Sequence, residues 1–137
     1  MSARSFFDSN VLVYTDDADA PAKQTKALEL LAAQRRAGTG VVSVQVLQEY
    51  FVAATKKLGV SPVAARRKTE LFGRFDLVTP GLDDVLGAID LHRLHPLSFW
   101  DAMIVRAALR SGCVRLYSED LRPGWRIDGL EVVNPFG

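Results

Sequence analysis

Short apolar runs alternate with longer helical segments along almost the whole chain, and this order limits the possible folds more than any other feature. Strands are predicted at 4–7, 41–42, 75–78, 114–117 and 130–133, the last of them at an edge of the sheet. Helices are predicted at 22–36, 44–58, 62–74, 82–94 and 98–111, with an apolar turn or short helix at 11–14. Runs such as Val41-Val42 have no polar face. The sequence therefore predicts a parallel sheet of about four to five short strands, flanked by helices on both faces.

Composition limits the class of protein. With 137 residues, 48% of them hydrophobic and 24% charged, the chain fits one domain spanning 1–137. No signal peptide or membrane-spanning run is visible, and a single cysteine, Cys113, excludes an intrachain disulfide, so we expect a cytoplasmic protein with a buried thiol. A net charge of +1 excludes general polyanion binding by the protein as a whole.

Four acidic residues, far apart in the chain, are each embedded in apolar sequence. They are Asp8, Glu49, Asp101 and Asp120. A carboxylate in such a setting is costly to desolvate unless it has a partner. Asp8 and Asp120 both follow predicted strands, and parallel sheets bind their ligands at the carboxyl ends of the strands. If the fold brings the four together, the natural partner is a divalent metal ion.

Each of three acids also has a purely structural explanation. Asp8 at a strand-to-helix turn is a good N-cap, and the nearby Asn10 would either stabilise that turn or hold a metal-bound water. Asp101 stands three residues after Ser98, the spacing of a capping box. Glu49 lies near the buried side of its predicted helix, where a salt bridge to a lysine or arginine would also satisfy it.

The fourth acid has a neighbour that competes with it. Because alternate residues at a strand end face opposite ways, only one of Glu119 and Asp120 should point into the site. We predict that Asp120 points inward, supported by a hydrogen bond to Ser118, and that Glu119 faces solvent.

Other polar residues are assigned to the scaffold. His92 and His95 are interpreted as helix-end residues, since no third histidine or cysteine accompanies them as a zinc ligand. The aspartates at 16, 17 and 19 are interpreted as loop and helix-start residues. The basic run Lys56, Lys57, Arg66, Arg67 and Lys68 is interpreted as a solvated helix face, with a phosphate-binding patch as the alternative if an acidic centre lies nearby.

The ordered set of motifs resembles PIN-domain ribonucleases, and more narrowly VapC-type toxins of bacterial toxin–antitoxin pairs. The matching stretches are Phe7-Asp8-Ser9-Asn10-Val11-Leu12-Val13-Tyr14, Val42-Ser43-Val44-Gln45-Val46-Leu47-Gln48-Glu49, Leu97-Ser98-Phe99-Trp100-Asp101-Ala102, Leu116-Tyr117-Ser118-Glu119-Asp120-Leu121 and Gly129-Leu130-Glu131-Val132-Val133-Asn134-Pro135-Phe136. Order and spacing agree over essentially the whole length. Ser9 stands where many relatives have threonine, which keeps the hydroxyl.

The resemblance implies a PIN-like α/β fold and an endoribonuclease that uses Mg²⁺ or Mn²⁺. It implies that Asp8, Glu49, Asp101 and Asp120 converge as catalytic and metal-binding residues, with Asn10 and Ser118 supporting them. It further implies single-stranded RNA as substrate, a cognate antitoxin as partner and a homodimer.

Two other functions are compatible with parts of the sequence. A PIN-like module that binds RNA or protein without cutting is the alternative, although all four acids are intact. A phosphatase with an aspartyl nucleophile is a more distant one, because it requires Asp-x-Asp and here the residue two positions after Asp8 is Asn10.

Overall fold

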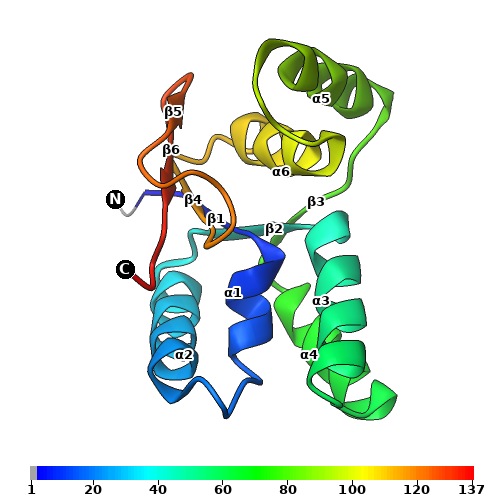
Figure 1. Cartoon of the computed structure of the whole chain (residues 1–137), viewed down its shortest axis with the longest axis vertical. Helices are drawn as coiled ribbons and strands as arrows, with labels where there is room; N and C mark the ends of the chain where they lie inside the picture. The colour runs from blue at the N-terminus through cyan, green and yellow to red at the C-terminus, as the bar shows by residue number, and fades with distance from the viewer. Residues whose placement is uncertain (1–2) are drawn as a thin grey trace.

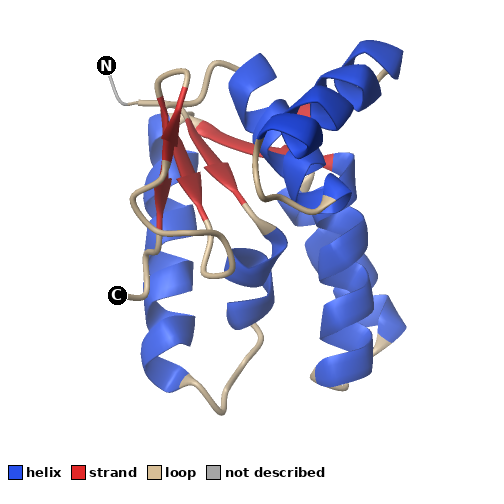
Figure 2. Ribbon diagram, turned by 45° about the horizontal axis from the view of Figure 1, so that its top comes forward, coloured by secondary structure: helices blue, strands red, loops and turns tan. Residues whose placement is uncertain are grey.

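The computed structural model describes residues 3–137 as a six-stranded, mostly parallel sheet flanked by helices (Figures 1 and 2). The strands are β1 (Ser5–Phe7), β2 (Gly40–Ser43), β3 (Asp76–Val78), β4 (Arg115–Tyr117), β5 (Arg126–Ile127) and β6 (Leu130–Val133). Their order across the sheet is β3-β2-β1-β4-β6-β5, and only the β5–β6 pair is antiparallel. The predicted α/β class with a parallel sheet is confirmed.

Each helix begins within two residues of its predicted start. They are α1 (Ser9–Tyr14), α2 (Pro21–Ala37), α3 (Val44–Lys57), α4 (Pro62–Phe72), α5 (Leu82–Leu94) and α6 (Phe99–Arg110). Ser43, Ser61 and Ser98 cap α3, α4 and α6, each accepting a hydrogen bond from the backbone N–H three residues on, at 3.3, 3.2 and 3.1 Å. Helix α1 packs between α2 and α3, while α5 packs on α6 (Figure 1).

The core lies along the central strands. Every residue of β1 and β2 is buried, and because successive side chains face opposite sides, both faces of these strands are covered. The Phe7 ring lies between those of Phe75 and Tyr117, with centroids 5.7 and 5.6 Å away. The first residue of β2 is Gly40, and a side chain does not fit there, because a Cβ would lie 2.5 Å from the Phe75 ring.

Two details of the sheet differ from the prediction. The sheet has six strands, one more than the upper expected number, because β5 spans only two residues and carries no apolar pattern. Consequently the strand predicted at 130–133 is not at the edge: β5 pairs with its outer side.

The remaining scaffold predictions are consistent with the structure. Cys113 is buried, and burial raises the pKa of its thiol. His92 lies in the last turn of α5 and His95 is its C-cap. Within residues 3–137, none of the helices combines the length and the hydrophobicity that crossing a membrane requires.

The topology produces a natural binding point between β1 and β4. From β1 the chain proceeds outward to β2 and β3, whereas β4 continues on the other side to β6. Ligands of parallel sheets bind where the strand order changes direction in this way, at the carboxyl ends of the strands. The two strand ends are tied together, since the Asp8 N–H donates to the Tyr117 carbonyl at 3.0 Å.

Candidate active site

Asp8 follows β1 directly and is the most deeply buried of the four predicted acids, with 6% of its surface exposed. Its Oδ1 accepts the Ser9 N–H at 2.7 Å, as an N-cap would. Its Oδ2 accepts the Ser118 hydroxyl at 2.8 Å and lies 3.4 Å from the Asn10 amide nitrogen. No cation pairs with it within residues 3–137. The carboxylate therefore caps α1 and still lacks a positive partner.

The environment of Asp8 disfavours its charge. Burial raises the pKa of Asp8 to about 6, even though the hydrogen bonds from Ser118 and Ser9 oppose this shift. The negative charges of Glu49 and Asp120 raise it further, so both carboxylates lie near enough to repel it. A buried acid with this environment is characteristic of functional sites.

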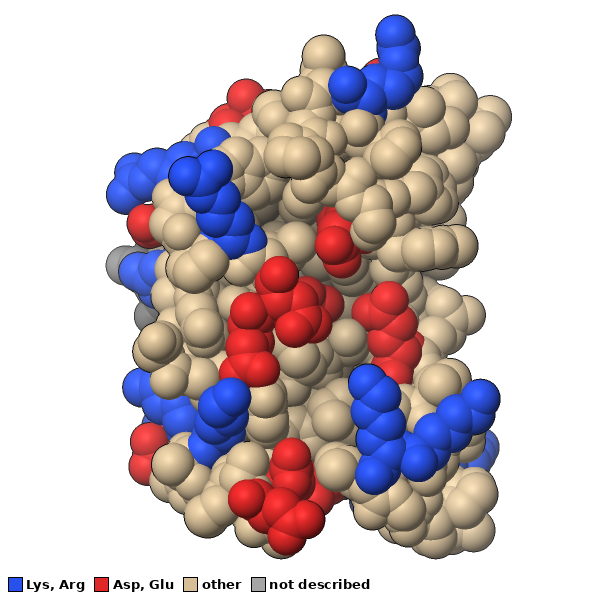
Figure 3. Space-filling model, viewed as in Figure 1, with Lys and Arg blue, Asp and Glu red and all other residues tan. Residues whose placement is uncertain are grey.

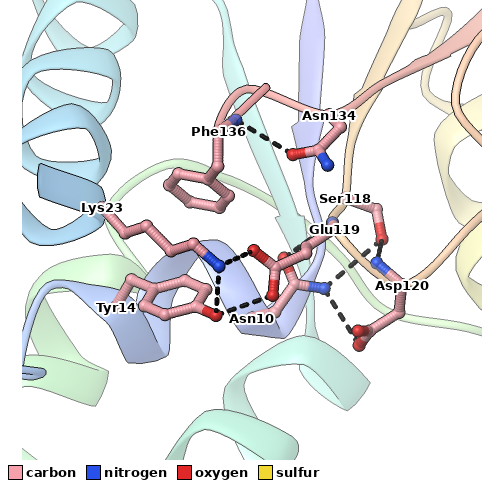
Figure 4. A network of polar contacts seen from close by, with 8 residues as sticks. All are labelled: Asn10, Tyr14, Lys23, Ser118, Glu119, Asp120, Asn134 and Phe136. Atoms are coloured by element: carbon pink, nitrogen blue, oxygen red, sulfur yellow. Dashed lines mark hydrogen bonds and ion pairs between the residues drawn. The ribbon is translucent and has the colours of Figure 1, made fainter. Parts of the chain in front are cut away.

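Ser118 connects Asp8 to the end of β4. Its Oγ donates to Asp8 and accepts the Asp120 and Leu121 N–H groups at 3.2 and 3.3 Å. Asn10 completes the connection, because its amide nitrogen lies 3.2 Å from Asp120 Oδ2 and its Oδ1 accepts the Glu119 N–H at 3.1 Å (Figure 4). Asp8 and Asp120 are thereby held beside the same two polar side chains.

Glu49 and Asp101 come from two different helices that meet through one side chain. The Gln45 amide nitrogen lies 3.2 Å from Glu49 Oε2 and 3.1 Å from the Trp100 carbonyl. The alternative of a salt bridge for Glu49 is wrong, because no lysine or arginine pairs with it in the described part of the chain. Only half of the predicted capping box is formed: Ser98 accepts the Asp101 N–H, while the Asp101 carboxylate accepts no hydrogen bond from residues 3–137.

Acidic side chains gather around a hollow on one face of the molecule, but the four predicted acids do not form a tight cluster. Figure 3 shows Asp and Glu side chains gathered around a depression in the middle of one face, with Lys and Arg side chains on its flanks. Asp8 and Asp120 share hydrogen-bond partners, and Glu49 acts on Asp8 through its charge. Among the residues that the structure describes, no three His, Cys, Asp or Glu side chains are close enough to hold one ion as they stand.

The prediction that the Glu119 side chain faces solvent is wrong. Its carboxylate accepts the Tyr14 hydroxyl at 2.6 Å and pairs with the Lys23 ammonium at 2.7 Å (Figure 4). Burial alone would raise the pKa of Glu119, but the hydrogen bonds from Lys23 and Tyr14 outweigh this effect and lower it. Lys23 also lies over the rings of Tyr14 and Phe136, at 4.9 and 5.9 Å from their centroids. Glu119 thus faces away from Asp120 and is neutralised by a lysine.

A second missed contact ties the loop after α1 to the helices beside it. Asp16, which lies in a loop as predicted, accepts the Tyr50 hydroxyl at 2.5 Å and the Lys68 ammonium at 2.6 Å. The signal was present in Tyr50, since a buried tyrosine hydroxyl requires a hydrogen-bond partner. Of the basic run, Arg66 and Arg67 pair with Glu70, whereas Lys56 and Lys57 form no ion pair within residues 3–137. The run is therefore not a uniform solvated face.

Ser118→Ala is expected to destabilise the protein, because Ser118 links Asp8 to the segment after β4. The substitution removes the hydroxyl donor to Asp8 and leaves two backbone N–H groups near it without an acceptor. We expect a loss of about 1–3 kcal/mol in the free energy of unfolding, measured by urea denaturation. Ser111→Ala is the control, because its hydroxyl donates to backbone carbonyls such as that of Ala107, at the end of α6. An equal loss in both variants would contradict a special role for Ser118.

Sequence and structure comparisons agree with this fold. The model of the PIN domain family matches residues 5–124, so the chain belongs to the PIN domain family. No curated protein matches it in sequence.

Solved structures of toxins share the fold. The chain is similar to Mycobacterium tuberculosis VapC20, a toxin that cleaves the sarcin–ricin loop, with 20% identity and a TM-score of 0.69 over 85% of this chain and 89% of that one. It is similar to a toxin–antitoxin complex from Klebsiella pneumoniae, with 22% identity and a TM-score of 0.69 over 96% and 97% of the two chains. The DNA-bound VapBC from Salmonella typhimurium gives 18% identity and a TM-score of 0.66 over 96% and 97%. At these identities the likeness establishes the fold.

Proposed function

We propose that the protein is an endoribonuclease that depends on Mg²⁺ or Mn²⁺ and hydrolyses RNA phosphodiesters at Asp8, Glu49, Asp101 and Asp120. The observation that carries the proposal is Asp8: a buried carboxylate, lacking a cationic partner, at the point where the strand order reverses. Two further carboxylates, Glu49 and Asp120, lie near enough to raise its pKa, and Gln45 joins Glu49 to the Trp100 carbonyl, which precedes Asp101 in the first turn of α6. Membership of the PIN family supports the same chemistry.

The donor set fits a hard divalent cation. All four side chains offer carboxylate oxygen, and neither histidine nor the cysteine is among them, which favours Mg²⁺ or Mn²⁺ over zinc. Asp8 and Asp101 would be the most direct ligands, with Glu49 and Asp120 completing the site. When bound, such an ion lowers the pKa of a water and stabilises negative charge on a phosphate.

The protein's own residues orient these carboxylates. Ser9 and Ser118 fix both oxygens of Asp8, so its charge is presented in one direction. Asn10 holds Asp120 toward Asp8, and Gln45 holds Glu49 toward the start of α6. Such supporting hydrogen bonds reduce the reorganisation that metal and substrate binding would otherwise require.

We further propose that the protein is the toxin of a toxin–antitoxin pair. The support is the similarity to three structures that are themselves toxins or toxin complexes. Its partners would then be a cognate antitoxin and a second copy of the chain in a homodimer, acting in the cytoplasm. Single-stranded RNA is the expected substrate, since a duplex would restrict access of a phosphate to a recessed acidic site.

A cleavage assay tests the nuclease proposal. Purified protein is incubated with labelled RNA and Mg²⁺ or Mn²⁺, with and without chelator, beside Asp101→Asn. Cleavage is expected with metal, and its loss is expected with chelator and in the variant, which also excludes a contaminating nuclease. Cleavage indifferent to chelator and to the substitution would contradict the proposal. Metal binding and RNA binding without cleavage would favour the non-catalytic PIN-like module instead.

A further inference from the structure

A groove extends from Asp120 along the side of α1 toward the end of α3. Its volume is about 300 Å³, and its lining includes Asn10, Tyr14, Lys57, Glu119 and Asp120. It therefore connects one of the proposed metal ligands with a lysine that the sequence places in the basic run.

Charges along the groove decide what it can hold. Glu119 carries no uncompensated charge, because Lys23 pairs with it at 2.7 Å. Asp120 would be compensated by the proposed metal ion. Lys57 is exposed and forms no ion pair within residues 3–137, so its ammonium is available to a ligand. The remaining acid, Asp17, accepts the Asp19 N–H at 3.1 Å and does not pair with Lys57.

We propose that this groove holds the RNA strand next to the phosphate at the acidic centre, and that Lys57 binds one of its backbone phosphates. The inference rests on the proposed function. A strand that places one phosphate among four carboxylates needs cationic contacts beside them, because the acids repel the rest of its backbone. Lys57 is the cation that the groove supplies. Its role is in positioning the strand, since it lies outside the acidic centre.

The neighbouring lysine provides a matched control. Lys56 precedes Lys57 in the same last turn of α3, is also exposed and also lacks an ion pair within residues 3–137, but it does not line the groove. Removing either lysine changes the net charge by the same amount. A difference between the two variants therefore reports on position and not on overall charge.

Binding of a short fluorescent single-stranded RNA, followed by anisotropy in the presence of Mn²⁺, tests the inference. An Asp8→Asn background prevents cleavage during the titration. Lys57→Ala is expected to weaken binding about three- to tenfold and to reduce the salt dependence by about one counterion, whereas Lys56→Ala changes neither. Lys57→Arg should retain most of the affinity, and Lys57→Glu should weaken it further. Thermal melting confirms that each variant is folded.

The outcomes separate this inference from the nuclease proposal. Equal affinities of Lys57→Ala and Lys56→Ala would overturn the groove assignment, as would absence of RNA binding. If wild-type protein cuts RNA and Lys57→Ala does not change RNA affinity, the nuclease proposal is supported and the groove assignment is wrong. If RNA binding depends on Lys57 and no condition yields cleavage, the groove assignment is supported and the nuclease proposal is wrong.

Discussion

Asp8→Asn is expected to reduce RNA cleavage by a factor on the order of 10²–10⁴ while raising the stability of the metal-free protein at neutral pH. Cleavage falls because the substitution removes the most buried of the proposed ligands. Stability rises because burial raises the pKa of Asp8 to about 6, so an ionised carboxylate is held in an unfavourable environment above that pH. A shift of this size corresponds to about 3 kcal/mol at most. Asparagine keeps an oxygen for the Ser9 N–H.

The difference in stability between Asp8→Asn and wild type should depend on pH. The folded pKa of Asp8 lies above the unfolded value, so the folded protein binds the proton more tightly. Its contribution to stability is complete below the unfolded pKa, near 4, and is lost as the pH rises through about 6. The stability gap between Asp8→Asn and wild type should therefore open across that interval and then stay constant.

Urea denaturation with chelator, repeated at several pH values, measures this gap. Asp90→Asn is the matched control, because Asp90 is 69% exposed on α5 and is not one of the four acids, so it should show no gap. A metal-free Asp8→Asn protein that unfolds more easily than wild type at neutral pH would contradict the proposed environment of Asp8. Added Mn²⁺ should reverse the order, since only the wild type keeps all four carboxylates.

Asp84→Ala is expected to produce the largest loss of stability, about 2–4 kcal/mol in the free energy of unfolding. Asp84 has only 4% of its surface exposed. It accepts the Gly81 N–H at 2.8 Å, the Arg106 Nε at 3.1 Å and an Arg110 nitrogen at 2.7 Å. Its removal leaves the start of α5 without a cap and two arginines of α6 without their partner.

The pH dependence of Asp84 runs opposite to that of Asp8. The Gly81 hydrogen bond and the two arginines hold the pKa of Asp84 below its ordinary value, although burial opposes them. Its stabilisation is present above the unfolded pKa and is lost as the pH falls through the lowered folded value. Asp83→Ala is the control, since Asp83 is exposed in the same helical turn. Equal stabilities of the two variants, or a lower affinity for Mn²⁺ in Asp84→Ala, would contradict a purely structural role.

These two buried aspartates illustrate how structure and function separate in this chain. Asp84 has two cationic partners and a lowered pKa, as expected of a residue that stabilises the fold. Asp8 has hydrogen-bond donors and no cation among the residues that the structure describes, and its pKa is raised. An external cation is what would satisfy Asp8.

Much of the fold was accessible from the sequence because its signals are local. Ser43, Ser61 and Ser98 mark helix starts through contacts made within three residues. Buried runs such as Val41-Val42 indicate a sheet covered on both faces without reference to any distant residue. Strand β5 escaped prediction because its two residues take their conformation from pairing with β6, which local propensity does not encode.

Contacts between distant residues account for the other errors. Glu119 meets Lys23 and Tyr14 across about a hundred residues of sequence, so its local context suggested solvent instead. Asp16 lies in a loop as predicted, and its contacts with Lys68 and the Tyr50 hydroxyl form only in the folded chain. The position of Asp8 was more predictable, because it depends only on the end of one strand and on the rule for parallel sheets.

Locating Mn²⁺ by its anomalous scattering in crystals of the protein tests the proposed metal centre most directly. The prediction is a peak within coordination distance of Asp8 and Asp101 carboxylate oxygens, bordered by Glu49 and Asp120, that is absent from crystals of Asp101→Asn. The Asp8 and Asp101 carboxylates should lie closer together than in metal-free crystals. Mn²⁺ bound elsewhere, or a fully occupied site that does not include the Asp8 carboxylate, would contradict it.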